Sequence, residues 1–151
     1  MHITYREATE HDISDIVKLS QGGSTGLAPT SEEQTQRAVK RWTGYMNGTH
    51  TPNHGKPPRL VYAAFDEGRL IGNMACHHCD KQGCQAELQS IHVYPEYQCK
   101  GIGAHLLLIA VDWLLQEGIA SMLVGFDEHN PYQRFYLKYG GIKAAPYRCE
   151  W

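Results

Sequence analysis

The sequence predicts an α/β (α+β) fold in which one mixed, mostly antiparallel sheet of six to seven strands is flanked by about four helices. Three observations indicate this fold. Segments with strand periodicity alternate with segments with helical periodicity along the whole chain. Short turns join three consecutive strands near the middle, which makes those strands antiparallel. A long apolar helix then follows a pair of glycines. The length of 151 residues suits a single domain covering residues 1–151.

The first third of the chain reads as a strand followed by two helices. ITYREAT, residues 3–9, alternates apolar and polar side chains like a half-buried strand. EHDISDIVKLSQ follows as a helix with Asp12 as a candidate N-cap. SEEQTQRAVKRWTGYMN is a second helix, capped by Ser31 and polar enough to lie on the surface. Loops rich in Gly, Ser, Asn and Pro are expected at residues 21–30 and 47–58.

The remaining elements are three hairpin strands, a buried helix and a closing unit. RLVYAAFD and RLIGNMACHHC flank the turn EGR, and the turn DKQG leads into CQAELQSIHVY. From Gly103 to Gln116 nearly every position is apolar, which predicts a helix largely buried against the sheet and ended by Gly118. The segments ASMLVGFD, NPYQRFYLKYGG and IKAAPYRCEW then predict a buried strand, a helix and one or two closing strands.

Composition and charge exclude several classes of protein. Fourteen basic and sixteen acidic residues give a formal charge of −2, so no bulk charge favours nucleic acid or an anionic membrane as a partner. No apolar run approaches the roughly 20 residues of a membrane span, and MHITYREATEHD is too polar for a secretory signal. Five cysteines without framework spacing suit a reducing compartment. A cytoplasmic location is therefore expected.

The stretch YPEYQCKGIGAHLLL, residues 94–108, carries the clearest functional signal. Gly101 and Gly103 remove side chains where a helix is about to begin. The first amides of a helix have no partner within it and lie at the positive end of its dipole, so a phosphate can bind there. A tight strand-to-helix turn that binds nothing is the alternative. A dinucleotide site would need a parallel βαβ unit and a further glycine, and no Lys-Ser/Thr pair follows as in a nucleoside triphosphate loop.

Two motifs resemble one family. QCKGIGA, residues 98–104, fits the pattern Q/R-x-x-G-x-G/A of the acetyl-CoA pyrophosphate loop in the GNAT superfamily of N-acetyltransferases. NPYQRFYLKYGGIK is similar to the family's later Asn-x(n)-F-Y-x-K-x-G-F segment. The motifs cover about residues 87–142, and the order of elements matches from Ile3 to Trp151. One departure is Gly141, where the family usually has an aromatic residue.

The resemblance implies a GNAT-like acyl-CoA N-acyltransferase fold with acetyl-CoA as cosubstrate. Backbone groups of Ile91 and Val93, with His92 between them, would pair with the pantetheine arm like an added strand. Asn130 would hydrogen-bond the same arm, although capping its own helix is the rival explanation. Phe135 would pack beside the cofactor. The pyrophosphate cradle would consist of Gln98, Cys99, Lys100, Gly101, Ile102, Gly103 and Ala104, with the Lys100 side chain either adding charge or simply solvated.

The same resemblance implies an acid and a base. A primary amine is mostly protonated at neutral pH, so a base must remove its proton. Glu87 is the first choice, because it lies eleven residues before Gln98, where several family members carry a catalytic glutamate. A polar residue at a hairpin edge is the alternative for Glu87, and His92 or a water is the competing base. Tyr136 would protonate the departing thiolate, with core packing as its alternative role.

These residues predict an N-acetyltransferase that moves an acetyl group from acetyl-CoA to a primary amine of a small molecule or peptide by direct transfer in a ternary complex. The alternative is a non-catalytic acyl-CoA-binding or sensor module with the same fold. The acceptor is not readable, because the loops at residues 21–30 and 47–58 carry no motif. Whether the protein is a homodimer is left open.

Three other features were candidates for a site. CHHCDKQGC has the composition of half a zinc site, but Cys76 and Cys79 would point to opposite faces of a strand, which favours a metal-free hairpin. Cys99 could suggest an acyl-cysteine, but its neighbours are amides that face phosphate rather than the thioester. The aromatic residues Trp42, Tyr45 and Tyr62 would line an acceptor pocket or pack in the core.

Overall fold

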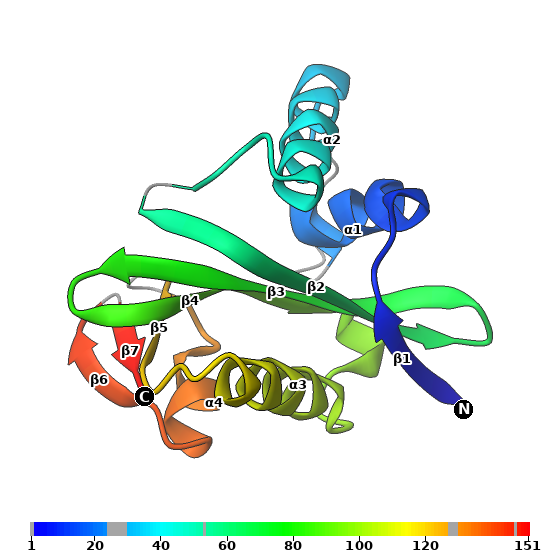
Figure 1. Cartoon of the computed structure of the whole chain (residues 1–151). Coiled ribbons are helices and arrows are strands. Elements are labelled where there is room, and N and C mark those ends of the chain that lie inside the picture. The colour runs from blue at the N-terminus through cyan, green and yellow to red at the C-terminus, as the bar shows by residue number, and fades with distance from the viewer. Residues whose placement is uncertain (1, 24–29, 53, 127–129, 147) are drawn as a thin grey trace.

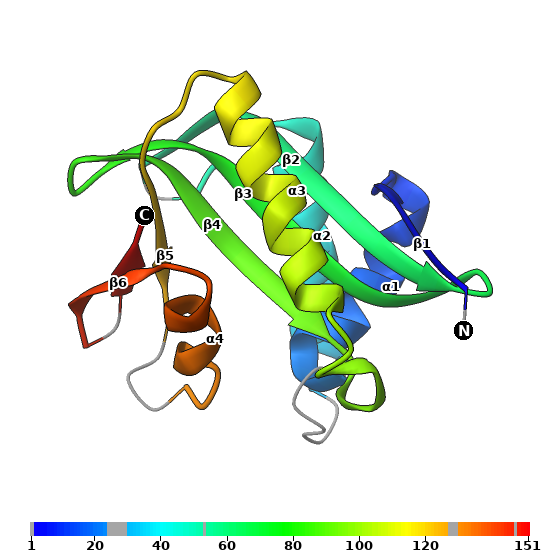
Figure 2. The ribbon, with the colours of Figure 1, turned by 90° about the horizontal axis from the view of Figure 1, so that it is seen from below.

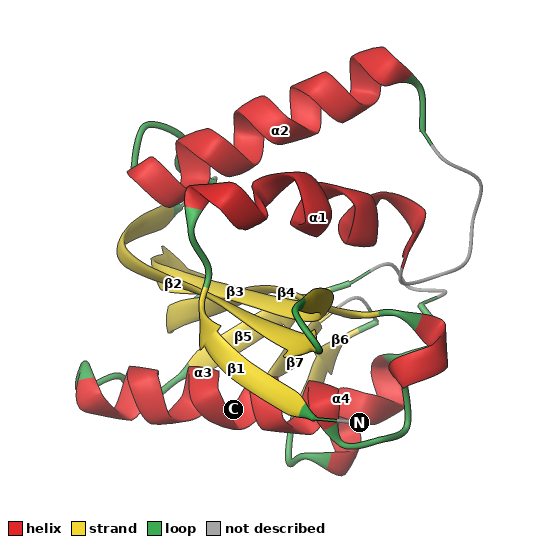
Figure 3. Cartoon of the chain, turned by 90° about the vertical axis from the view of Figure 1, so that its right-hand side faces the viewer, coloured by secondary structure: helices red, strands yellow, loops and turns green. Residues whose placement is uncertain are grey.

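The computed structural model describes residues 2–23, 30–52, 54–126, 130–146 and 148–151. Within them a seven-stranded sheet has the strand order β1-β2-β3-β4-β5-β7-β6. Neighbouring strands run antiparallel except for β4 and β5, which are parallel. Helices α1 and α2 cover one face of the sheet, and α3 and α4 cover the other (Figures 1 and 3). The expected fold class is confirmed.

The first elements are β1 (Ile3–Glu7), α1 (Ile13–Lys18) and α2 (Glu32–Asn47). A 3-10 turn, η1 (Glu10–Asp12), precedes α1, and a short irregular helical segment, η2 (Leu19–Gly23), follows it. Asp12 is the N-cap residue of α1, as expected, but its side chain makes no capping hydrogen bond to that helix. The Asp12 carboxylate instead accepts from the amide of Thr9, the N-cap of η1, at 2.8 Å. Ser31 caps α2 as predicted, because its Oγ accepts from the Gln34 amide at 3.3 Å.

The hairpin strands are β2 (Gly55–Asp66), β3 (Arg69–Lys81) and β4 (Cys84–Val93). Two-residue turns at positions 67–68 and 82–83 join them. The segment CHHCDKQGC forms the expected hairpin end. Strand β2 begins four residues earlier than expected, because its register shifts between Lys56 and Arg59 and pairing continues on both sides of the two prolines.

The last elements begin with the short turn η3 (Pro95–Tyr97) and α3 (Ile102–Gln116). They continue with β5 (Met122–Gly125), α4 (Gln133–Lys138), β6 (Ile142–Ala145) and β7 (Arg148–Glu150). Gly118, with a φ of +74°, follows the end of α3 as predicted. The expectation that α3 is largely buried is wrong, because Leu108 and Leu115 are 58% and 64% exposed on its outer side.

Two apolar clusters fill the space between the sheet and its two helix layers. The cluster on the α3 and α4 face includes Met74, Leu88, Ile102, Leu106, Val124 and Tyr136. The cluster on the α1 and α2 face includes Ile16, Leu19, Trp42, Tyr45, Ala63 and Ala75. Side chains of β2 and β3 alternate between the two clusters, as the pleat of a sheet requires. No helix in the described part of the chain is both long and apolar enough to cross a bilayer.

Candidate active site

The site begins where the two parallel strands part. Strands β4 and β5 pair at Ala86 with Met122 and at Glu87 with Leu123. Among the described residues they form no pair after Glu87, and β4 continues alone on that side to Val93 (Figure 2). A bulge in β4 between Leu88 and Ser90 accompanies this separation. The strands therefore leave an open backbone edge inside the sheet.

The open edge presents backbone groups of Ile91 and Val93. The Tyr94 amide donates to Ile71 of β3 at 3.0 Å. Because backbone groups of successive residues point to opposite neighbours, His92 also faces β3, whereas Ile91 and Val93 face the opening. The Val93 carbonyl already accepts from Gln98 Nε2 at 2.9 Å, which ties the following loop to the end of β4. Ile91 and Val93, which were expected to pair with a pantetheine arm, thus lie on the free edge, and the Val93 carbonyl is already hydrogen-bonded to Gln98.

The loop after η3 turns sharply into α3. Cys99 and Gly101 have φ values of +58° and +85°, and Gly101 is the N-cap of the helix. The His105 amide makes the first helical bond, to the Gly101 carbonyl at 2.9 Å. The preceding amides, those of Ile102, Gly103 and Ala104, therefore have no acceptor within the helix. This is the geometry that an anion needs at a helix start.

Three elements converge on this helix start. A Cβ added to Gly103 would lie 3.5 Å from the Phe135 ring of α4 and 3.9 Å from the Ile91 side chain of β4. The structure therefore brings together Gly103, Phe135 and Ile91, three residues that the resemblance assigns to the binding of acetyl-CoA. The Lys100 ammonium lies 5.3 Å from the centre of the Tyr97 ring, so its charge stays beside the loop.

Tyr136 lies inside an aromatic cluster on the α3 and α4 face. Its ring stacks on Phe126 at 5.8 Å between centroids and meets Phe135 and Trp151 edge-on at 5.2 and 6.0 Å. Burial raises the pKa of Tyr136 to about 12, so the phenol keeps its proton at neutral pH. Both roles predicted for Tyr136, packing and proton donation, are compatible with this environment.

Asn130 stands at the start of the α4 segment. Its Oδ1 accepts from the Tyr132 amide at 2.8 Å, which stabilises the turn before the helix. The N-cap of α4 is Tyr132, so Asn130 does not cap the helix. The helix itself begins at Gln133, two residues later than the sequence suggested.

The departure at Gly141 has a structural cause. A Cβ at this position would lie 2.8 Å from the Trp151 ring and 2.9 Å from the Tyr136 carbonyl oxygen. Trp151 is fixed there by its indole N–H, which donates to the Tyr139 carbonyl at 2.9 Å. The last residue of the chain therefore fills the space beside α4 that a side chain at position 141 would need.

Glu87 lies on the opposite face of the sheet from Tyr136. Its Oε1 is 3.0 Å from Lys81 Nζ, and its Oε2 is 3.4 Å from His77 Nε2. His77 Nδ1 is in turn 2.9 Å from the Tyr45 hydroxyl. Burial alone would raise the pKa of Glu87, but His77 and Lys81 outweigh it and lower the pKa below its usual value. The carboxyl group is therefore ionised at neutral pH.

His92, the competing base, points toward the α1 and α2 face, opposite Asn73 on β3. Burial lowers the pKa of His92 to about 4, so its ring is neutral at pH 7. His92 Nδ1 and both side-chain polar atoms of Asn73 have no hydrogen-bond partner among the described residues. Neither the backbone nor the side chain of His92 faces the open edge of β4, so its expected place beside the cofactor gains no support.

The other candidate residues lie in different parts of the structure. Trp42 and Tyr45 pack on the α1 and α2 face, whereas Tyr62 packs against the cluster on the other face, so the three aromatic residues do not line one pocket. Cys99 is exposed in the loop before α3. No group of three metal-ligating side chains was found in the described ranges. Of the loops that would shape an acceptor site, residues 24–29 and 53 lie outside the described part of the chain.

Three residues around Glu87 were not predicted from the sequence: Lys81, His77 and Tyr45. A regular hairpin from the turn at positions 82–83 would pair His78 with Glu87. The register irregularity between His78 and Lys81 instead places His77 opposite Glu87. The sequence contains no signal for this shift.

Comparisons with known proteins agree with the geometry. Residues 27–141 match the acetyltransferase (GNAT) family. An uncharacterized N-acetyltransferase of Bacillus subtilis strain 168, YuaI, is 36% identical over 150 residues, covering 95% of this chain and 82% of that protein. The structure resembles the PaiA N-acetyltransferase of Thermoplasma acidophilum in complex with coenzyme A, with a TM-score of 0.70 and 21% identity over 99% of this chain and 98% of that chain.

A second solved structure shows the same fold. It is a GNAT family acetyltransferase of Brucella melitensis in complex with acetyl-CoA, with a TM-score of 0.61 and 20% identity over 98% of this chain and 86% of that one. The match over most of the chain, together with the parted strands and the glycine-lined helix start, leads to one conclusion. The chain belongs to the acetyltransferase (GNAT) family.

Proposed function

We propose that the protein transfers an acetyl group from acetyl-CoA directly to a primary amine of a small molecule or peptide, with both substrates bound at once. The observation that carries the proposal is the opening between β4 and β5. The free helix-start amides and Tyr136 lie on one side of it, and Glu87 lies on the other. The coenzyme A and acetyl-CoA complexes of the two similar structures support the choice of donor.

On the donor side, acetyl-CoA supplies a thioester whose carbonyl carbon is open to attack. The amides of Ile102, Gly103 and Ala104 would bind its pyrophosphate, and the open edge at Ile91 and Val93 would hold the pantetheine arm. The Tyr136 phenol would donate its proton to the sulfur as the carbon–sulfur bond breaks. The burial that raises the pKa of Tyr136 makes its phenol a weaker acid, but the same burial would disfavour the thiolate, so the two effects on the proton transfer oppose each other.

On the acceptor side, the amine nitrogen forms the new bond to the carbonyl carbon and gives up one proton. Glu87 would receive that proton, directly or through a water. A carboxylate offers about four acceptor positions, and Lys81 and His77 occupy two of them. Cys99 has no part in this sequence, because it lies at the pyrophosphate end of the loop. The amine proton thus ends on Glu87, and the Tyr136 proton ends on the thiol.

The test is a screen of primary amines with acetyl-CoA, read by release of free thiol and by the mass of the acetylated product. Acceptor-dependent thiol release by the wild-type protein is expected. Glu87→Gln should lower kcat/KM by roughly 10 to 100-fold, and Glu96→Gln, an exposed control, should not change it.

The pH dependence of kcat/KM distinguishes titration of Glu87 from titration of the amine acceptor. In the wild type, activity should be lost as the pH falls through the lowered pKa of Glu87. Two acceptors of different basicity are needed, because the pKa of the amine can produce a similar limb. Acetyl-CoA binding without thiol release for any amine would contradict the proposal and favour an acyl-CoA-binding module.

A further inference from the structure

We propose that His77, held by Tyr45 of α2, is a positioning residue that orients the Glu87 carboxylate and keeps it ionised. The inference depends on the proposed function only for its catalytic consequence. The electrostatic link between His77 and Glu87 can be measured without any turnover.

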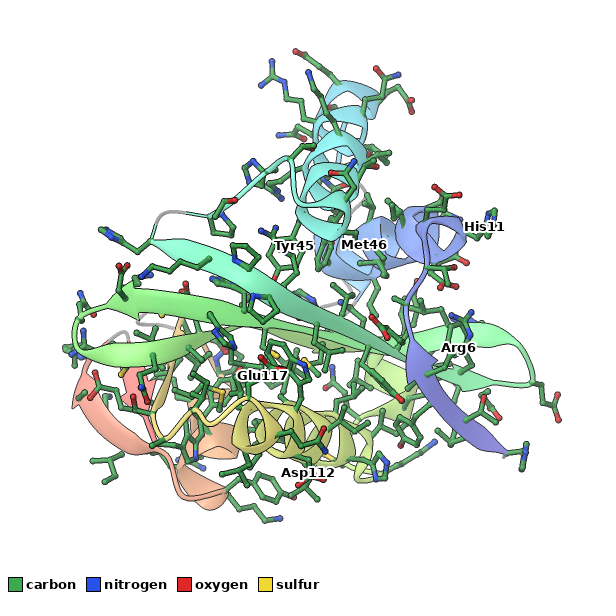
Figure 4. All side chains as sticks on the ribbon, viewed as in Figure 1. Arg6, His11, Tyr45, Met46, Asp112 and Glu117 are labelled. Carbon is green, nitrogen blue, oxygen red and sulfur yellow. The ribbon has the colours of Figure 1, made fainter. Side chains whose placement is uncertain are left out.

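The three side chains form a continuous buried chain between α2 and β4. His77 is 1% exposed and Tyr45 is 4% exposed, and the Glu87 side chain is 10% exposed. The Tyr45 hydroxyl lies 2.9 Å from His77 Nδ1, and His77 Nε2 lies 3.4 Å from Glu87 Oε2, close enough for an ion-pair contact but without hydrogen-bond geometry. Tyr45 stands at the end of α2 nearest the sheet (Figure 4). The chain therefore connects the helix layer over this face with the proposed base.

Tyr45 and His77 are both held in place by their surroundings. The Arg59 guanidinium packs 4.8 Å from the centre of the Tyr45 ring and donates to the Tyr45 carbonyl at 2.7 Å. The Tyr45 and His77 rings meet edge-on at 5.7 Å. A Cβ on Gly55 would lie 3.0 Å from His77 Nε2, so the His77 ring packs closely on the backbone of β2. Both rings are therefore in contact with neighbouring groups on more than one side.

The Tyr45 hydroxyl has two acceptors within reach. It lies 2.9 Å from His77 Nδ1 and 3.1 Å from the Cys76 carbonyl oxygen, and a carbonyl can only accept. When the hydroxyl donates to Nδ1, a His77 ring with one proton carries that proton on Nε2. The Nε2 proton then faces Glu87 Oε2 and stabilises the ionised carboxylate. Donation from Tyr45 to Nδ1 is therefore the arrangement in which His77 stabilises ionised Glu87.

Other charged and titratable groups near Glu87 limit the effect that a His77 variant can have on its pKa. Lys81 contacts the other carboxylate oxygen at 3.0 Å, and Cys79 lies on the same strand as Lys81. Across the sheet, β5 offers only the apolar Leu123 at the paired position. Lys81 would still stabilise the carboxylate after a change at His77. The expected effect of a His77 variant is therefore partial.

The direct experiment follows the Glu87 carboxyl carbon by NMR in protein labelled with ¹³C-glutamate, with the signal assigned from the spectrum of Glu87→Gln. His77→Asn keeps an acceptor for Tyr45 in its amide oxygen and removes the donor toward Glu87, so the titration midpoint should rise by about one pH unit. His77→Gln places an uncharged donor near Oε2 and should restore part of the shift. His78→Asn, on the other face of the same strand, should leave the midpoint unchanged. An unchanged midpoint in folded His77→Asn would overturn the proposal.

A second measurement covers the case in which His77→Asn does not fold. The ¹⁵N shifts of the His77 ring in the wild type should show a proton on Nε2, and Tyr45→Phe should change that pattern. A wild-type His77 with no proton on Nε2 would refute the arrangement.

Kinetics then separates this inference from the proposed function. If Glu87 is the base, the acidic limb of the kcat/KM profile moves with the NMR midpoint in His77→Asn. If the midpoint moves and the limb does not, the support of Glu87 by His77 stands and the base role of Glu87 fails.

Discussion

At the scale of single residues, Tyr136 combines an observed packing role with the proposed role of proton donor. The phenol is held by Phe126, Phe135 and Trp151, and its raised pKa keeps it protonated across the neutral range. Removal of the hydroxyl alone leaves the ring contacts intact. Tyr136→Phe therefore isolates the proposed chemical role from the packing role.

We predict that Tyr136→Phe lowers kcat by roughly 10 to 100-fold with little change in acetyl-CoA affinity, because the hydroxyl acts as charge develops on sulfur. Steady-state kinetics and calorimetric titration measure the two quantities. Tyr132→Phe, an exposed tyrosine next to the same helix, is the control. A kcat equal to that of the wild type would leave Tyr136 as a core residue only.

The residues of the site differ in how far the sequence reveals them. Glu87, Tyr136 and the glycine loop were proposed from the resemblance to the GNAT family, and the structure places Tyr136 and the helix start on one face of the sheet and Glu87 on the other. His77 was not found, because its position opposite Glu87 depends on an irregular register. Trp151 was not found either, since its packing against Tyr136 and Gly141 joins the end of the chain to α4.

At the scale of elements, the first strand is joined to the first helix by an ion pair. Arg6 of β1 donates to both carboxylate oxygens of Asp12, at 2.7 and 2.9 Å. The contact with Arg6 and the hydrogen bonds from Thr9 lower the pKa of Asp12 to about 2 from an ordinary value of 3.8. A lowered carboxyl pKa stabilises the folded state above the unfolded value, and that stability is lost as the pH falls through the folded value.

We predict that Asp12→Asn lowers the free energy of unfolding at pH 7 by about 1 to 2 kcal/mol, allowing for the half-exposed Arg6 partner. The difference from wild type should shrink between about pH 4 and pH 2. Urea denaturation at several pH values measures it. Asp15→Asn, whose pair with Lys18 is exposed, should cost less than half as much. A difference that stays constant down to pH 2 would show that the ionised carboxylate is not its source.

Most elements follow from local patterns, and the exceptions have physical causes. Periodicity and turn residues located the two hairpins, the Ser31 cap and the helix that Gly118 ends. The start of β2 was missed, because two adjacent prolines lack the amides that a ladder uses, and only tertiary pairing shows that the strand continues through them. The exposure of Leu108 and Leu115 was missed, because an all-apolar helix carries no sign of which side meets solvent.

At the scale of the whole molecule, the sheet separates the two halves of the proposed reaction. The α3 and α4 face carries the helix-start amides, Phe135 and Tyr136, and the α1 and α2 face carries Glu87 with His77 and Tyr45. The two faces are open to each other where β4 and β5 stop pairing. The fold class could be predicted from the sequence, but this division could not, because it depends on where two parallel strands stop pairing.

The central claim is that acetyl-CoA binds at the start of α3, and the affinity of Gly103→Val for acetyl-CoA tests it most directly. Gly103 suits this test better than Gly101, since a φ of +85° at Gly101 would add backbone strain to any substitution. A Cβ at Gly103 makes only ordinary contacts, but a branched side chain would cover the free amides. Leu108→Val, on the outer side of the same helix, is the matched control.

We predict that, by calorimetric titration, folded Gly103→Val binds acetyl-CoA at least tenfold more weakly than the wild type, or by about 1.4 kcal/mol. Leu108→Val should bind with wild-type affinity. An unchanged affinity in Gly103→Val, with a melting temperature near that of the wild type, would contradict the placement of the cofactor at this helix start.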